Sequence, residues 1–320
     1  MNTIKYYLLY AIVYLLSILP FWLLYVISDF NYLIFYRLVG YRRKIVRKNL
    51  RNSFPEKTES ELKAIEKKFY HWFCDYILET FQLISISDKK LLKHMEYRGL
   101  EQLEECFDRK QDTAVILGHY CNWEWMSSIG LGFKRYPEAV VNALYHKLKS
   151  PSVDRLFLKI RKAKGCVPIE KSKILRHLLK WKMDDTRYMT AYISDQGPRW
   201  HNIHLWIDFM NQNTPVFTGG ERLMRKMNNA VFYIKMERPK RGKYIATFIP
   251  ITYEPNKLPE FEITKRFFKM LEDSIKEHPE FYLWSHNRWK RTREKYDQIM
   301  AERKRESAER IEKQQTFNHE

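Results

Sequence analysis

The stretch TAVILGHYCNWEWMSSIG, residues 113–130, joins an apolar run to a turn and then to a mixed segment. Residues 113–117 are all apolar or β-branched, which is typical of a short strand buried on both faces. Gly118 and His119 follow this run directly, and Glu124 lies in the helical stretch beyond it. Ligands of α/β enzymes bind beyond the carboxyl ends of the strands. The stretch therefore predicts an α/β fold in which His119 lies at the end of a strand.

The rest of the chain from residue 113 onward continues this alternation. Four more β-rich runs occur, at residues 139–144, 188–194, 230–237 and 244–249. Between or after them lie helical stretches, at residues 153–164, 172–182, 220–227 and 264–277. Upstream, residues 59–82 have apolar side chains at helical spacing. The pattern predicts an α/β fold with a central, mostly parallel or mixed sheet flanked by helices.

The N-terminal region has no charged residue between Lys5 and Asp29. As one helix it would be about 34 Å long at ~1.5 Å per residue, enough to span a bilayer. Only Lys5 precedes it, whereas a basic cluster follows, comprising Arg37, Arg42, Arg43, Lys44, Arg47, Lys48 and Arg51. This bias places the body of the protein on the cytoplasmic side. We expect a retained membrane anchor, although Pro20 leaves open a re-entrant or interfacial hairpin, and a buried helix hairpin is the alternative.

Composition and motifs narrow the function classes. The 320 residues include 57 Lys+Arg and 38 Asp+Glu, a net charge of +19, and 45% are hydrophobic. This composition excludes general disorder and indicates an anionic partner, such as a lipid surface, a nucleic acid or an acidic carrier protein. The four cysteines form no C-x-x-C pair, which argues against a zinc ribbon, a redox pair or a disulfide scaffold. No P-loop, dinucleotide-binding or serine-elbow motif occurs.

His119 and Glu124 form the candidate catalytic pair. Neither a regular helix nor a strand brings residues five apart onto one face, but a turn that leads into a helix can do so. In that arrangement the carboxylate accepts the imidazole N–H and fixes the tautomer that a general base needs. The pair then activates a hydroxyl group. The alternative is a capped, buried histidine beside a glutamate at a helix N-terminus.

Four segments in order carry a resemblance to a known family: GHYCNWE (118–124), YHKLKSPSVDRLFLKIR (145–161), SDQGPR (194–199) and YLWSHNRWK (282–290). The first resembles the H-x4-D/E motif of the lysophospholipid acyltransferase superfamily, and especially the late acyltransferases of lipid A biosynthesis. The resemblance covers roughly residues 5–292. It implies a fold like that of the glycerophosphate acyltransferases.

The resemblance also implies roles for individual residues. His119 is the general base and Glu124 its partner, and Arg161 and Asp195 match two further active-site positions. We expect Arg161 to contact the tetrahedral oxyanion or a phosphorylated acceptor, and Asp195 to orient Arg161 or a substrate group. The alternatives are a solvated cation on a basic helix for Arg161 and a cap on backbone N–H groups for Asp195.

Two further residues are predicted to bind substrate. Gln196 follows Asp195 in the same turn, and Arg288 lies between His286 and Lys290 in YLWSHNRWK. The basic groups of this last segment are expected to bind a phosphate or a carrier protein. The alternative is that the two tryptophans of the segment only hold the terminal helix in place. Residues 145–147 read Tyr-His-Lys where family members often carry Tyr-Arg-Pro, so a phosphate contact expected there is weakened or replaced.

The predicted function is transfer of a fatty acyl group from acyl carrier protein to a hydroxyl of a lipid A precursor. The expected partners are the acylated carrier protein, the glycolipid and membrane lipids. The expected location is the cytoplasmic face of the bacterial inner membrane. No nucleic acid, cofactor or metal is expected. One alternative is acylation of a lysophospholipid, aminolipid or other glycolipid, including transfer from acyl-CoA. The others are a membrane-tethered basic nucleic-acid-binding protein and a scaffold without activity.

The chain is expected to have four parts. These are a membrane anchor (1–36), a basic juxtamembrane and amphipathic helical region (37–100), a catalytic α/β domain (101–292) and a charged C-terminal helical tail (293–320).

Overall fold

A seven-stranded sheet forms the centre of the protein in the computed structural model, which describes residues 2–317. The order is β1-β9-β8-β2-β5-β3-β4, and all neighbouring strands are parallel except in the β8–β9 hairpin. The predicted α/β class with a mostly parallel, mixed sheet is confirmed. The strands are β1 (Met95–Arg98), β2 (Thr113–Leu117), β3 (Val140–Tyr145), β4 (Val167–Glu170), β5 (Tyr188–Ile193), β8 (Ala230–Lys240) and β9 (Lys243–Thr252).

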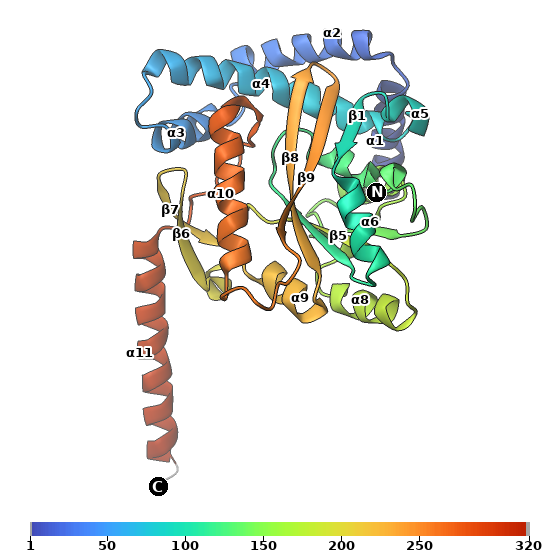
Figure 1. The fold of residues 1–320 in the computed structure, drawn as a ribbon. Coiled ribbons are helices and arrows are strands. Elements are labelled where there is room, and N and C mark those ends of the chain that lie inside the picture. Colours follow the sequence, from blue (N-terminus) through green and yellow to red (C-terminus); the bar gives the residue numbers. More distant parts are fainter. Residues whose placement is uncertain (1, 318–320) are drawn as a thin grey trace.

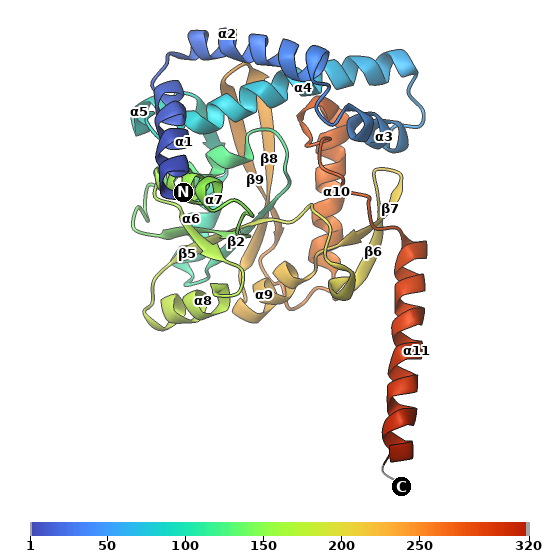
Figure 2. The ribbon, with the colours of Figure 1, turned by 180° about the vertical axis from the view of Figure 1, so that it is seen from behind.

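Strand β2 lies inside the sheet between β8 and β5, and all its residues are buried. This position explains the unbroken apolar run at 113–117, because helices cover both faces of the sheet. Figures 1 and 2 show α10 on one side of the sheet, α7 and α1 on the other, and α4 across one end with α2 above it. The carboxyl end of β2 is thus enclosed by helices.

The helices agree closely with the predicted stretches. The helix α4 spans the expected residues and begins with a capping box, in which the Thr58 hydroxyl accepts from the Glu61 N–H and the Glu61 carboxylate accepts from the Thr58 N–H. The helices of the body are α3 (Arg43–Ser53), α4 (Glu59–Gln82), α5 (Asp88–Leu91), α6 (Leu100–Asp108), α7 (Pro151–Lys162), α8 (Ile174–Met183), α9 (Gly219–Met227) and α10 (Glu262–Glu277). Short 3-10 segments are η2 (Trp123–Gly132), η3 (Trp200–Asn202) and η4 (Pro279–Phe281).

The N-terminal region is broken into two helices rather than one. The helix α1 (Asn2–Ser17) ends before Pro20, and α2 (Phe21–Tyr32) continues into the π-helical turn η1 (Leu33–Leu38). The two parts meet at a bend of 120°. Among residues 2–317 no single helix is long and apolar enough to cross a membrane, and only this bent pair meets the length and composition criteria together. A straight anchor is therefore not confirmed, whereas the break expected at Pro20 is present.

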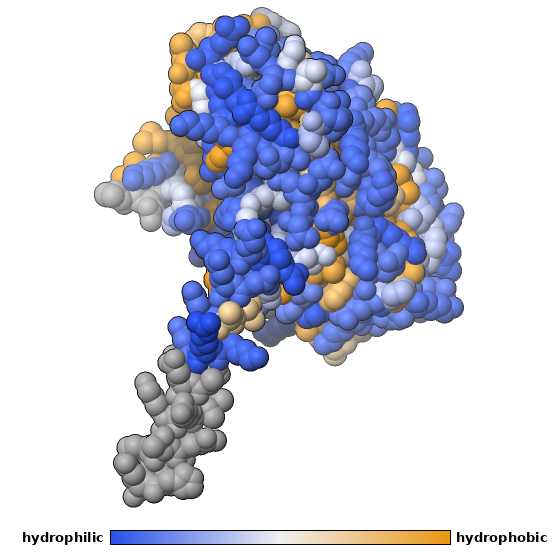
Figure 3. Space-filling view, turned by 90° about the vertical axis from the view of Figure 1, so that its left-hand side faces the viewer, coloured by the Kyte–Doolittle hydropathy of each residue, from blue (hydrophilic) through white to orange (hydrophobic). Residues whose placement is uncertain are grey.

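Both N-terminal helices pack on the body and leave apolar side chains exposed. The helix α1 contacts α7 and α4, and α2 runs along α4 (Figure 2). In Figure 3 hydrophilic residues dominate the face in view, and hydrophobic ones gather along its upper and left edges. The large apolar side chains exposed in the N-terminal region are Ile4, Tyr7, Leu8, Ile12, Tyr14, Leu15, Ile18, Trp22, Val26, Phe30, Leu33, Leu38 and Val39.

Two elements lie beside the sheet. The hairpin of β6 (Leu205–Phe209) and β7 (Gln212–Val216), which the sequence did not predict, turns at Met210 and Asn211, both with positive φ. The charged helix α11 (Arg293–Phe317) extends away from the body (Figure 1). The sequence predicted a charged helical tail at residues 293–320, of which residues 318–320 lie outside the described part of the chain.

Candidate active site

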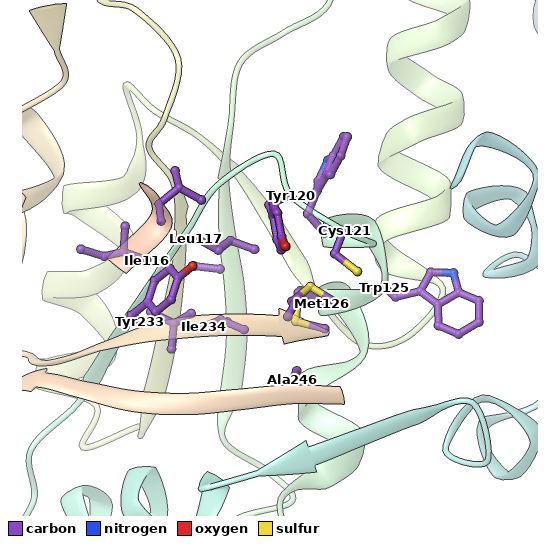
Figure 4. Close-up of a cluster of buried hydrophobic side chains, with 14 of the residues drawn as sticks. Ile116, Leu117, Tyr120, Cys121, Trp125, Met126, Tyr233, Ile234 and Ala246 are labelled. Carbon is purple, nitrogen blue, oxygen red and sulfur yellow. The ribbon is translucent and has the colours of Figure 1, made fainter. Parts of the chain in front are cut away.

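The turn that follows β2 carries His119 and rests on a buried apolar cluster. Side chains of β2, β8, β9 and the turn itself meet there (Figure 4), among them Tyr120, Cys121 and Trp125. Gly118 suits the start of the turn, because a Cβ at this position would lie 2.8 Å from the methyl groups of Leu271 on α10 and would force that side chain to shift. Close contact between the turn and α10 therefore fixes where the chain leaves the strand.

A segment distant in sequence holds the backbone of the turn. The Leu283 N–H donates to the His119 carbonyl at 3.1 Å, and the Cys121 N–H donates to the Phe281 carbonyl at 2.8 Å. Cys121 has a φ of 54°, a conformation that a non-glycine residue adopts only when its surroundings impose it. Residues 281–283 thus clamp the turn and orient His119.

His119 is paired with Asp195. Its Nδ1 lies 2.6 Å from Asp195 Oδ1, and the Gln196 amide nitrogen lies 3.1 Å from its Nε2. Because an ionised carboxylate only accepts hydrogen bonds, Nδ1 carries the proton and Nε2 is left as an acceptor. The imidazole is 18% exposed, whereas the Asp195 side chain is 3% exposed. This is the geometry of a general base that remains reachable from the surface.

The charge of Asp195 is maintained despite its burial. Burial alone would raise the pKa of this carboxyl, but the charge and hydrogen bond of His119, together with the nearby Arg288, hold the pKa below its ordinary value. Asp195 therefore remains an anion that stabilises a protonated His119.

The sheet register explains this pairing. β2 and β5 are parallel neighbours with Leu117 opposite Ile193, and His119 and Asp195 each follow these residues by two positions. Residues at equal distance beyond the ends of adjacent parallel strands meet at the same edge of a sheet.

No hydrogen bond or ion pair joins Glu124 to His119 within the described residues, which corrects the predicted pairing. It lies in the first turn of η2 and accepts two hydrogen bonds from Arg161 of α7, at 2.8 Å from Nε and 2.6 Å from Nη2. Burial would lower the pKa of Arg161, but the charge of Glu124 and its hydrogen bonds raise it. The partners are thus exchanged relative to the prediction. Asp195 was expected to orient Arg161 but pairs with His119, and Glu124 was expected to pair with His119 but binds Arg161. Spacing along the chain suggested the wrong partner because the 3-10 turn directs Glu124 toward α7.

Arg288 is also placed beside this site. It is 2% exposed, and its Nη2 donates to the Pro215 carbonyl at 2.8 Å. It lies close enough to Asp195 to help hold down the pKa of that carboxyl. The structure therefore gathers His119, Asp195, Gln196 and Arg288 around one strand end.

Glu79 on α4 is a further contributor that sequence reasoning missed. Its carboxylate accepts from Asn122 Nδ2 at 2.9 Å, from Tyr25 at 2.8 Å and from Tyr244, and its carbonyl accepts from the Trp125 indole at 2.9 Å. Burial raises the pKa of this carboxyl, and the nearby charge of Arg238 offsets this rise only in part. Glu79 joins the turn that carries His119 to α2 and to the β8–β9 hairpin. Its signal in the sequence is a pair of acidic residues, Asp75 and Glu79, spaced four apart among the aromatic and apolar residues of this helix.

No metal is assigned to the described part of the chain. The group of Asp29, His71 and Asp75 has the spacing to hold an ion, but Arg241 already donates to both carboxylates. A cavity of about 750 Å³ lies where β2 and β8 begin, between residues such as Asp112 and Asn228. It is at the opposite end of β2 from His119, so we do not place the reaction there.

Comparison with known proteins agrees with the motifs and geometry. A family model described as bacterial lipid A biosynthesis acyltransferase matches residues 1–291. The chain is also 23% identical over 260 residues to the lipid A biosynthesis lauroyltransferase of Escherichia coli (strain K12), a match that covers 79% of this chain and 81% of that protein. The resemblance inferred from the four sequence segments is confirmed, and the chain belongs to the bacterial lipid A biosynthesis acyltransferase family.

Proposed function

We propose that this protein transfers a fatty acyl group from acyl carrier protein to a hydroxyl of a lipid A precursor, with His119 as general base. The family supports an acyltransferase with a lipid A-type acceptor. The observation that carries the mechanism is the contact of 2.6 Å between His119 Nδ1 and the buried Asp195 carboxylate. It supports a tautomer whose Nε2 can accept the proton of a hydroxyl group.

In the proposed reaction the acceptor hydroxyl displaces the Gln196 amide from His119 Nε2. The hydroxyl proton moves to Nε2 as its oxygen attacks the thioester carbonyl, which gives a tetrahedral oxyanion and an imidazolium facing Asp195. Collapse of the oxyanion breaks the C–S bond and forms the ester. The proton on Nε2 passes to the leaving thiolate, so the histidine ends in its starting state.

The remaining site residues take supporting roles in this proposal. The Gln196 amide, which is 3.1 Å from Nε2, is a donor positioned beside the developing oxyanion. Arg161 is engaged by both oxygens of Glu124, so the pair acts as a positioning element that connects α7 to η2. No cofactor is needed for these steps.

The donor and the location are inferred from charge and surface. The net charge of +19 suits an acidic carrier protein, as it suits an anionic membrane surface. The exposed apolar side chains of α1 and α2 suit attachment to the cytoplasmic face of the inner membrane. We therefore retain acyl carrier protein, a lipid A precursor and membrane lipids as the proposed partners.

The test is mass spectrometry of lipid A from a deletion strain that expresses the wild-type protein, His119→Ala or a control. The control is His177→Ala, because His177 is an exposed histidine on α8. We expect one acyl mass to be missing with His119→Ala and restored with the wild type and the control. Normal lipid A in the His119→Ala strain would contradict the mechanism. Normal lipid A in the deletion itself, without a redundant enzyme, would contradict the acceptor and direct the search to other acylated lipids.

A further inference from the structure

A buried guanidinium group lacks the partners that burial normally requires. Arg288 uses Nη2 to donate to the Pro215 carbonyl at 2.8 Å. Its Nε and Nη1 are buried and have no hydrogen-bond partner among residues 2–317. Buried donors left unpaired cost free energy, and a buried cation normally has an anion beside it.

A second guanidinium group converges on the same place. A Cβ at Gly197 would lie 3.1 Å from Arg288 Nη1 and 3.7 Å from Arg291 Nη1, so both groups lie over this one backbone position. Arg291 also has a buried Nε without a partner in the described chain, and its guanidinium lies 5.6 Å from the centre of the Trp200 ring. Because residue 197 has no Cβ, the two guanidinium groups pack directly over its backbone.

The charges around Gly197 are predominantly positive. Burial lowers the pKa of Arg288, Tyr282 and Asp195 partly offset this effect, and repulsion from Arg291 lowers the pKa further. Burial and the neighbouring Arg199 likewise lower the pKa of Arg291. Within the described residues neither Arg288 nor Arg291 forms an ion pair with a carboxylate, and Asp195 is engaged by His119. Asp195 offsets part of the charge of Arg288, but three arginines outnumber this one carboxylate, so a bound anion would relieve the remaining repulsion.

We propose that Arg288 and Arg291 form, over Gly197, a subsite that binds a phosphate group of the substrate. Guanidinium groups present several N–H donors in a plane that matches phosphate oxygens. Gly197 follows Gln196, whose amide contacts His119, so a phosphate bound here anchors the substrate beside the reacting hydroxyl. The identity of the substrate rests on the proposed function, but the affinity for phosphate does not.

Two sources could supply this phosphate: a phosphate monoester on the glycolipid acceptor, or the phosphodiester of the prosthetic arm of the carrier protein. Binding of the monoester would position the sugar of the acceptor, and binding of the phosphodiester would position the thioester of the donor. Kinetics with each substrate varied separately distinguish them, because loss of the subsite raises the KM of only the substrate that uses it.

The first measurement is direct binding of inorganic phosphate to the full chain, followed by tryptophan fluorescence, since Trp200 adjoins Arg291. The variants are Arg291→Gln and Arg291→Lys, with Arg293→Gln as the matched control, because Arg293 is exposed and paired with Asp297. We expect the Kd to rise at least about tenfold for Arg291→Gln, less for Arg291→Lys and not for the control. Unchanged affinity in Arg291→Gln, with its thermal unfolding unaltered, would overturn the subsite. A protein that binds phosphate in this way but transfers no acyl group would refute the proposed function and leave the subsite standing.

The second measurement is acyl transfer by the same variants. If the acceptor supplies the phosphate, Arg291→Gln raises the KM for the phosphorylated glycolipid by about tenfold or more and leaves the KM for the acyl carrier unchanged. The reverse pattern assigns the subsite to the carrier. Unchanged KM values for both substrates would overturn the proposal.

Discussion

Replacing Asp195 with asparagine removes one charge beside His119 and little else. The substitution keeps the size of the side chain and an oxygen that can accept from Nδ1, which now lies 2.6 Å from the carboxylate. The negative charge that faces the imidazolium during proton transfer is lost. We expect a large fall in kcat with a small change in KM, because the imidazolium exists only after proton transfer has begun.

The magnitude follows from the geometry. The close N–O contact places the two charge centres about 4 Å apart, where unit charges attract by about 4 kcal/mol at an effective dielectric constant near 20. Since about 1.4 kcal/mol corresponds to a tenfold change in rate, the expected loss is on the order of 10³-fold in kcat. The 3% exposure of the Asp195 side chain makes screening by water small.

The assay is a single-turnover measurement of acyl transfer, which separates chemistry from product release. Asp208→Asn is the matched control, since it makes the same chemical change at an exposed carboxylate on β6. The tautomer of His119 can be read in the same variants by ¹⁵N NMR of labelled histidine. A decrease in kcat of less than tenfold in Asp195→Asn, with the fold intact, would refute the role of Asp195 in orienting and charging the imidazole.

Three other variants test the surroundings of the site. Glu124→Gln removes the carboxylate that pairs with the charge of Arg161 and should reduce the free energy of unfolding by about 3 kcal/mol in denaturant titrations. Replacing both residues together should cost less than the sum of the two single changes. Glu79→Gln replaces the carboxylate that accepts from Asn122 with an amide. It should reduce the free energy of unfolding by on the order of 2 kcal/mol in the same titrations and should lower kcat. Unchanged activity would show that the turn keeps its conformation without the Glu79 carboxylate. Burial lowers the pKa of His286 from 6.5 to about 4, so its contribution to stability is present above pH 6.5 and is lost as the pH falls toward 4. Across this range the wild type should lose about 3 kcal/mol relative to His286→Gln, and equal pH dependence of the two proteins would contradict the partly buried, neutral histidine.

Local patterns in the sequence were sufficient to place the main elements and His119. The apolar run at 113–117 predicted a buried strand, and it became the interior strand β2. The turn after it was expected to present His119, and that is where the imidazole lies, partly exposed at the strand end. The amphipathic pattern of 59–82 also predicted α4 with its observed bounds. These features depend on hydrophobic periodicity and turn residues, which act over a few positions along the chain.

The sequence did not determine the partners of these side chains. His119 meets Asp195, 76 residues away, because β5 pairs with β2 in a parallel register, and Glu124 meets Arg161, 37 residues away, because α7 passes beside η2. The order of strands in a sheet is decided by the packing of the whole domain, so no spacing in the sequence contains it. The same holds for Arg288 and Arg291, whose convergence over Gly197 depends on the path of the chain after α10. Sequence alone determined which residues have the necessary chemistry, and only the tertiary structure decided which of them act together.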